Sequence, residues 1–226
     1  MTTTTRPRRE LANLSSRDQL RAGRLAVRLP LLLFGLYLYG AALAMIIKAD
    51  LGPTPWDVLH TGVIRHVPLS FGTIVVLVSV LVLPLWIPLK QKVGLGTIAN
   101  ALLVGPSADL TLWLLPTSDA LPIRIGLLIA GVLLNGVATA MYIGSQFGPG
   151  PRDGLMTGLA RVSGRSIRLV RTVLEVTVVI VGWLLGGIVG LGTLLYAVAI
   201  GPVTQIVLPI FTVDLKTDRR QRVPCR

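Results

Sequence analysis

Long apolar runs alternate with short polar segments along this chain. Six runs near 20 residues long stand at about 29–47, 70–89, 94–115, 122–143, 166–186 and 188–211. A helix of that length crosses roughly 30 Å of hydrocarbon. Because an unpaired backbone group facing lipid costs several kcal/mol, helices are the expected spanning form. The pattern therefore predicts an all-α membrane protein with six transmembrane helices.

The apolar pattern is duplicated. Residues 28–106 align without a gap on residues 124–202, at a constant offset of 96, with 30 identities in 79 positions. Each copy holds three predicted spans, and because three is an odd number the second copy should be inverted relative to the first. We expect two inverted three-helix repeats, each with a short interfacial or re-entrant helix.

This duplication predicts the organisation of the whole chain. The expected segments are a basic cytoplasmic tail at 1–27, a first membrane repeat at 28–106, the end of the third span with a linker at 107–123, a second membrane repeat at 124–211 and a basic cytoplasmic tail at 212–226.

Composition and charge refine the class. The 226 residues are 52% hydrophobic and only 14% charged, with a net charge of +12, whereas soluble domains carry about 25% charged residues. A soluble protein this basic would suggest nucleic acid, but topology explains the charge better. With both termini cytoplasmic, 18 of the 22 Lys and Arg residues fall inside, as the positive-inside rule requires. We expect a multi-pass membrane protein with both termini cytoplasmic that contacts lipid and not nucleic acid.

The first span could also be a cleaved signal peptide, since Ala42-Leu43-Ala44 resembles a cleavage site. The apolar run continues through Ile47, however, and the aligned Ala138-Thr139-Ala140 lies in the middle of the chain. A retained anchor is the expectation. The single cysteine, Cys225, excludes an internal disulfide.

A Gly-Pro-x-Pro-x-Asp motif marks both copies, at Gly52–Asp57 and Gly148–Asp153. Thr54 can cap a short helix in which Pro55 is the first residue, and Gly150 replaces the cap in the second copy. The predicted helices, about 55–66 and 151–162, are too short to span. Asp57 and Asp153 either cap these helices only or act as polar gates on opposite faces.

Paired Gly-Pro dipeptides lie near the middle of two predicted spans. Gly105-Pro106 in the third returns as Gly201-Pro202 in the sixth. Proline removes a backbone hydrogen bond, so both helices should kink or break, and such paired interruptions point to a transporter's binding site. Asn100, Asp109 and Gln205 are candidate ligands beside the breaks. A packing kink is the alternative.

An acid–base pair is predicted inside the fifth span. Arg171 and Glu175 are spaced i, i+4 and share one helix face. Charged residues inside a span suggest function by default, with a structural ion pair as the alternative. The pair could move a proton or orient an anionic group.

These motifs together resemble the YczE/YitT-type bacterial membrane proteins, over about residues 28–211. The resemblance rests on the doubled Gly-Pro-x-Pro-x-Asp motif, the Gly-Leu-Gly-Thr turns at 94–97 and 190–193, and the Gly-Pro pairs. It implies a small bacterial plasma-membrane protein with five or six spans. The family has no settled biochemical activity, so the resemblance supplies neither a substrate nor site residues.

Catalytic signatures are missing from the sequence. The only histidines are His60 and His66, and no zinc-protease motif, Walker loop or Cys/His cluster occurs. We expect no enzyme, no cofactor and no metal. The leading hypothesis is a secondary transporter or exporter of a small solute. The alternative is a non-catalytic accessory or regulatory protein that acts with another membrane complex. The partners considered are the lipid bilayer, a small solute, and a second copy or another membrane protein.

Overall fold

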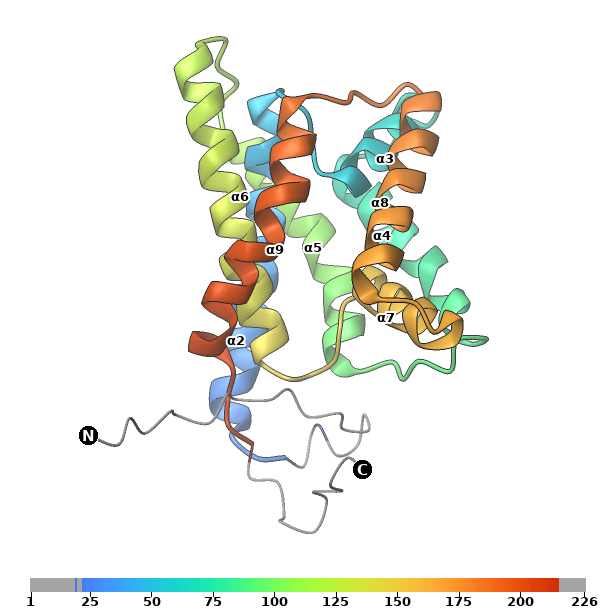
Figure 1. The fold of residues 1–226 in the computed structure, drawn as a ribbon. Helices are drawn as coiled ribbons and strands as arrows, with labels where there is room; N and C mark the ends of the chain where they lie inside the picture. The colour runs from blue at the N-terminus through green and yellow to red at the C-terminus, as the bar shows by residue number, and fades with distance from the viewer. Residues whose placement is uncertain (1–18, 20–21, 216–226) are drawn as a thin grey trace, which may run out of the picture.

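The computed structural model of the protein describes residue 19 and residues 22–215. Within them the chain is helical and contains no strand (Figure 1). Most of the two predicted basic tails, 1–27 and 212–226, lies outside the described residues. The helices are α2 (Leu25–Ala49), α3 (Pro55–Ile64), α4 (Phe71–Val82), η1 (Leu83–Trp86), α5 (Leu95–Leu114), α6 (Leu121–Gly144), α7 (Pro151–Ser163), α8 (Ile167–Leu184) and α9 (Leu191–Phe211).

Every predicted apolar run forms a helix, and both predicted short helices are present. In the described residues three helices, α2, α6 and α9, are long and apolar enough to cross a membrane. The remaining long helices fall short in length or apolar content: α4 ends at Val82 and tightens into η1 around Pro84, which lacks a backbone donor. The all-helical membrane architecture is thus confirmed at the level of three spans.

The predicted helix starts are confirmed by side-chain caps. Thr54 Oγ1 accepts from Asp57 N at 3.3 Å at the start of α3, with Pro55 as the first helical residue. Ser70 and Ser166 accept from the backbone at the starts of α4 and α8. These caps fix where each helix begins because they pair donors that the helix itself leaves unpaired.

The helices of the second half begin at the positions that the duplication dictates. α6, α7, α8 and α9 begin at residues 121, 151, 167 and 191, each 96 residues after α2, α3, α4 and α5. Figure 1 places the short helices α3 and α7 at opposite ends of the molecule. We call these ends the α3 end and the α7 end.

The two halves meet chiefly along α2 and α6, and they exchange equivalent contacts. A Cβ at Gly35 would lie 3.0 Å from Tyr142 N, and a Cβ at Gly131 would lie 3.3 Å from Ile46 N. Gly131 and Tyr142 are the aligned partners of Gly35 and Ile46. In each half the same aligned glycine therefore packs against the backbone of the opposite half. Small residues here let the helix backbones approach closely.

Two aligned arginines repeat this exchange at the ends of the helices. Arg28 Nε donates to Ser145 O at 2.8 Å, and Arg124 Nε donates to Ala49 O at 2.8 Å. Arg28 is completely buried and also lies over the Phe147 ring, 4.2 Å from its centroid. Each arginine therefore pairs the carbonyl groups that the opposite helix leaves free at its C-terminus.

The loops that precede the short helices also make equivalent contacts with the opposite half. Gly96 N donates to Phe147 O at 2.8 Å, and Gly192 N donates to Leu51 O at 2.8 Å. Gly52, which follows Leu51, has φ +112° and lies so close to Gly190 that a Cβ would be 2.7 Å from its N atom. Only glycine suits that combination of positive φ and close approach.

The outer faces of the helices are apolar. Leu191, Trp113 and Ile206 are 84%, 80% and 74% exposed, and many other large apolar side chains are exposed on α2, α4, α5, α6, α8 and α9. Soluble monomers rarely expose such continuous apolar surface. This distribution suits a protein whose perimeter contacts lipid.

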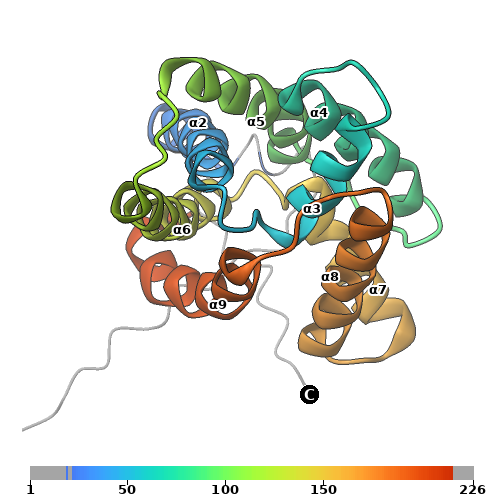
Figure 2. The same cartoon turned by 90° about the horizontal axis from the view of Figure 1, so that it is seen from above.

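The halves differ in one helix contact. In the first half α4 packs along α5, whereas in the second half α8 and α9 stand apart (Figure 2). A Cβ at Gly72 would lie 2.2 Å from Gly105 O, and a Cβ at Gly105 would lie 2.2 Å from Gly72 O. Arg168 aligns with Gly72, so the second half lacks the glycine pair that forms this backbone contact. We call the contact of α4 with α5 the glycine seam.

Of the predicted kink or break at each Gly-Pro pair, the break is wrong, since α5 and α9 remain helical through Pro106 and Pro202, and the kink stays a prediction. A single proline removes only one hydrogen bond from the helix. In α5 the next residue, Ser107, donates its hydroxyl to Leu103 O at 2.7 Å. Local hydroxyl bonds of this kind let membrane helices tolerate proline.

The glycine seam generates a stability prediction with a built-in control. Gly105→Ala forces a methyl group against the Gly72 carbonyl and should destabilise the protein by ~1–3 kcal/mol, the usual cost of overpacking. Gly201→Ala, at the aligned position, should have little effect because the nearest atom is Arg171 Nη1 at 3.9 Å. Thermal unfolding in detergent measures both. Equal melting temperatures for the two variants would contradict the seam.

Candidate functional site

A cavity of about 760 Å³ occupies the space between α7, α8 and α9. We call it the main cavity. It reaches the α7 end through the loop before α5 and the loop before α7. Its lining residues are Gln19, Tyr39, Pro55, Trp56, Lys90, Gln91, Lys92, Thr139, Tyr142, Ile143, Gln146, Gly148, Pro149, Arg152, Asp153, Met156, Thr157, Arg161, Arg171, Leu174, Glu175, Tyr196, Ile200, Gly201, Thr204 and Gln205.

The main cavity exists because α8 and α9 do not close on each other. In the described part of the first half the equivalent space is far smaller, since the glycine seam holds α4 against α5. At the position of Gly72 the second half carries Arg168, which is exposed and does not line the cavity. The opening thus coincides with differences between the two copies, of which Arg168 in place of Gly72 is one.

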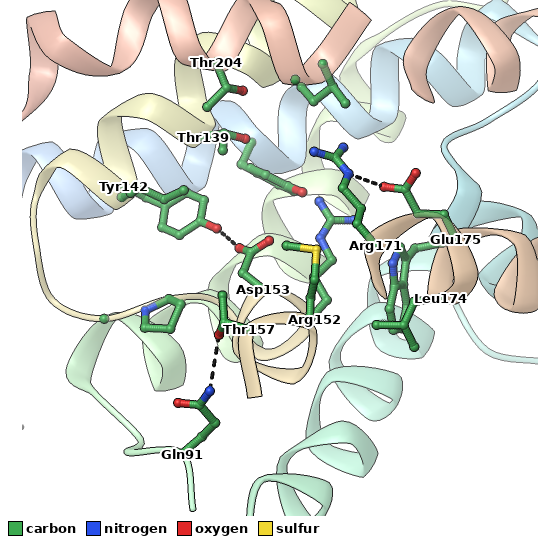
Figure 3. Close-up of a pocket in the computed structure, with 18 of the residues that line it drawn as sticks. Gln91, Thr139, Tyr142, Arg152, Asp153, Thr157, Arg171, Leu174, Glu175 and Thr204 are labelled. Carbon is green, nitrogen blue, oxygen red and sulfur yellow. Dashed lines mark hydrogen bonds and ion pairs between the residues drawn. The ribbon is translucent and has the colours of Figure 1, made fainter. Parts of the chain in front are cut away.

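The predicted pair in α8 faces this cavity. Arg171 Nε donates to Glu175 Oε1 at 2.8 Å, and both side chains line the space (Figure 3). Val173 and Val176 of the same helix are more than half exposed. The helix therefore turns its charged face inward and its apolar face outward, as a membrane helix beside a polar cavity must.

The first turn of α7 supplies two further charges. Asp153 accepts a short hydrogen bond from the hydroxyl of Tyr142 on α6. Arg152 lies over the ring of Tyr39 on α2, with its Cζ 5.1 Å from the ring centroid, a cation–π arrangement. In the described part of the chain Arg152 forms no ion pair with a carboxylate. The first turn of α7 thus places in the cavity a hydrogen-bonded carboxylate, Asp153, and a guanidinium, Arg152, that no described carboxylate neutralises.

A second, much smaller cavity of about 40 Å³ lies toward α3 and α4. We call it the small cavity. Asp57 and His60 of α3 form a buried pair on its wall, with Oδ1 and Nδ1 2.9 Å apart and exposures of 0% and 6%. Thr54 Oγ1 donates to the other carboxylate oxygen at 2.6 Å. Both carboxylate oxygens of Asp57 are therefore hydrogen-bonded where they lie.

The two cavities are built from equivalent positions. The small cavity is lined by 13 residues, and for 11 of them the aligned residue of the other half lines the main cavity. Asp57 corresponds to Asp153, Val75 to Arg171 and Ser79 to Glu175. Tyr39, Trp56 and Arg152 line both cavities and form a wall between them. The same site thus occurs twice, once hollow and once almost filled.

The structure brings together five of the nine residues that the sequence singled out. Arg171, Glu175, Asp153, Gly201 and Gln205 line the main cavity. The other four lie in the closed half of the molecule or at its seam.

Asp57 and Asn100 line the small cavity. Gly105 lies in the glycine seam, where its carbonyl contacts Gly72. These three predicted residues therefore belong to the closed half of the molecule.

Asp109 lies outside both linings, at the N-terminus of α4. Its Oδ2 accepts from Ser70 Oγ at 2.5 Å, and its Oδ1 accepts from Gly72 N at 2.7 Å. A carboxylate at a helix N-terminus pairs free amides and complements the helix dipole. Asp109 therefore fastens α4 to α5 beside the glycine seam.

Sequence reasoning missed Arg152, Tyr39 and Tyr142 as site residues. The signal was present for Arg152, because an arginine stands where the first copy has Trp56, next to the motif aspartate. Nothing in the sequence marks the two tyrosines, since their role depends on how α2 and α6 face α7.

The chemical character of the main cavity is that of a small-molecule pocket. Among the described residues no group of three His, Cys, Asp or Glu side chains is placed to hold a metal ion. The main cavity instead combines apolar walls with a few convergent polar groups, and its volume falls in the range of about 300–1,000 Å³ typical of small-molecule sites.

Comparison with known proteins bears out the resemblance. The family described as "Family of unknown function (DUF6198)" matches residues 26–209. An uncharacterized protein of Haemophilus influenzae is 41% identical over 180 residues, which cover 80% of this chain and 83% of that protein. The uncharacterized membrane protein YczE of Bacillus subtilis is 30% identical over 174 residues, or 76% and 80% of the two chains. No solved structure matches.

The similarity to YczE, which is described as a membrane protein, and the three long apolar helices agree on a membrane protein. A third relative, the uncharacterized protein YyaS of Bacillus subtilis, is 28% identical over 181 residues, which cover 78% of this chain and 90% of that protein. Because the matches span most of both chains, the duplicated helical region is the part that is shared.

The position of Asp109 generates a second stability prediction. Asp109→Ala removes two hydrogen bonds to a charged acceptor and should cost about 1.5–3 kcal/mol for each bond fully lost. Gln205→Ala, at the aligned position, should be near neutral because Gln205 is exposed to the cavity. Melting temperatures of the two variants in detergent measure this difference in stability. A larger loss for Gln205→Ala would show that Asp109 does not fasten α4.

Proposed function

The chain belongs to the family of unknown function DUF6198, and we propose that it is a secondary transporter of a small solute. In this proposal six helices span the bacterial plasma membrane as two inverted repeats, with both termini cytoplasmic. The observation that carries it is the pair of equivalent cavities, one of about 760 Å³ and one of about 40 Å³.

Inverted repeats give a transporter two equivalent conformations. If each half can adopt the shape that the other has now, the small cavity opens as the main cavity closes. The solute would then be exposed first at one membrane face and afterwards at the other. The aligned positions of the two linings support this exchange, with different side chains at several of them.

Orientation follows from the basic residues around the main cavity. Lys90 and Lys92 lie on its rim, and Arg161 donates to Leu89 O at 2.6 Å beside them. Under the positive-inside rule this is the cytoplasmic face. The structure would then correspond to an inward-open state, with the α3 end facing outside.

The proposal assigns different roles to the candidate residues. Glu175 and Arg171 would contact solute, and Asp57 and Asp153 would guard the outer and inner mouths. Asp109 would act as the latch of the closed half, because α4 has to leave α5 before the small cavity can open. The Asp109 hydrogen bonds to Ser70 and Gly72 are the polar contacts that this movement breaks.

Cysteine accessibility tests the alternation. Cys225 is the only cysteine, so Cys225→Ser gives a background for single labels at Thr139 and at the aligned Leu43. Thr139→Cys should react quickly with a membrane-impermeant maleimide applied from the cytoplasmic face. Leu43→Cys, 2% exposed, should react slowly and only from the outer face, and Asp109→Ala should speed it.

The competing outcomes are informative. If Leu43→Cys never reacts from the outer face in any condition, Asp109→Ala included, the alternation is contradicted. An accessory role in a larger membrane assembly then becomes the better explanation. Glu175→Gln adds a functional arm, since flux in proteoliposomes should fall while the melting temperature stays within a few degrees.

A further inference from the structure

We infer that the solute of the main cavity is a small anion whose charged group is held between Arg152 and Arg171. The inference rests on the transport function proposed above and names its substrate class. Carboxylates and phosphates fit this chemistry, because both accept hydrogen bonds from guanidinium groups in bidentate geometry.

Arg171 retains donors that the protein does not use. A guanidinium group has five N–H donors, and in the described residues the hydrogen bond from Arg171 goes through Nε alone, to Glu175 Oε1 at 2.8 Å. Its Nη1 is directed toward Gly201 on α9, 3.9 Å from the position of a Cβ there. Glu175 therefore orients Arg171 through Nε and leaves the two Nη groups of the guanidinium for the cavity.

Arg152 approaches the same space from the opposite side. Its guanidinium lies on the face of Tyr39, and no carboxylate among the described residues pairs with it within 4 Å. Figure 3 shows the side chains of Arg152 and Arg171 converging from α7 and α8. Two like charges that converge in a partly enclosed space repel each other, and a bound anion would remove that cost.

The acids in the cavity are less available than the bases. Asp153 already accepts from Tyr142, and Glu175 already accepts from Arg171. The rim adds Lys90, Lys92 and Arg161 to the basic side. The lining therefore holds five basic and two acidic residues, and a cleft with one predominant sign of charge draws the opposite charge toward it.

The aligned positions of the first half lack these charged groups. There Val75 and Ser79 replace Arg171 and Glu175, and Trp56 replaces Arg152. The charged groups of the anion site thus come from the second half, and Arg152 lies in the wall shared with the small cavity. Because Arg152 borders both cavities, it can stay with the anion in either conformation.

Protection from labelling tests the inference with a panel of simple anions as probes. The full chain with Cys225→Ser and Thr139→Cys is reacted with a maleimide in the presence of phosphate, sulfate, acetate, succinate, benzoate, choline or glucose at constant ionic strength. At least one anion should slow the reaction, and choline and glucose should not. Arg152→Gln and Arg171→Gln should each raise the half-protecting anion concentration about tenfold or more.

Two controls separate charge, fold and function. Arg165→Gln removes the same unit charge from an exposed position outside the lining and should change protection less than twofold. Arg152→Lys and Arg171→Lys keep the charge and should retain part of the protection, which guards against variants that fail to fold.

The inference is overturned if no anion protects, if choline or glucose protects instead, or if both Gln variants keep full anion protection. Outer-face labelling of Leu43→Cys reports on alternation independently of these results. An intact Leu43 response with no anion protection would leave the transport proposal standing and remove the substrate class alone.

Discussion

Each short helix begins on a loop that is tied by a backbone hydrogen bond to the last helix of the opposite half. Gly96 N to Phe147 O and Gly192 N to Leu51 O are the two bonds, both 2.8 Å long. Buried backbone groups have to be paired, and in a membrane no water replaces a lost partner. These two bonds therefore fix α3 and α7 relative to α9 and α5, and with them every charged side chain that the short helices present.

The main cavity lies where the two halves differ in sequence, although both halves share the contacts along α2 and α6. Both halves carry the same exchanged contacts along α2 and α6, but only the first half has glycine at both positions where α4 meets α5. Arg168 stands where the first half has Gly72. Arg152, Arg171 and Glu175 occupy positions that are Trp56, Val75 and Ser79 in the first half. The common contacts thus preserve the frame, and the substituted positions create an accessible, charged cavity in it.

The positions of the helices could largely be predicted from the sequence, because the length of each apolar run and the 96-residue repeat can be read directly along the chain. Charged residues inside a span were equally visible, and Arg171 with Glu175 was predicted and found in the cavity. Contacts between distant segments could not be predicted from the sequence. Asp109 looked like a ligand, but its bonds go to Ser70 and Gly72, more than 35 residues away. The proline breaks failed because one missing bond does not interrupt a helix.

The wall that separates the two cavities has a consequence for the cell. Tyr39, Trp56 and Arg152 belong to both linings, so the space on one side ends where the space on the other begins. While these side chains stay in place, the main cavity and the small cavity remain two separate spaces. In the proposed transporter, this separation would let a solute pass without short-circuiting the proton-motive force.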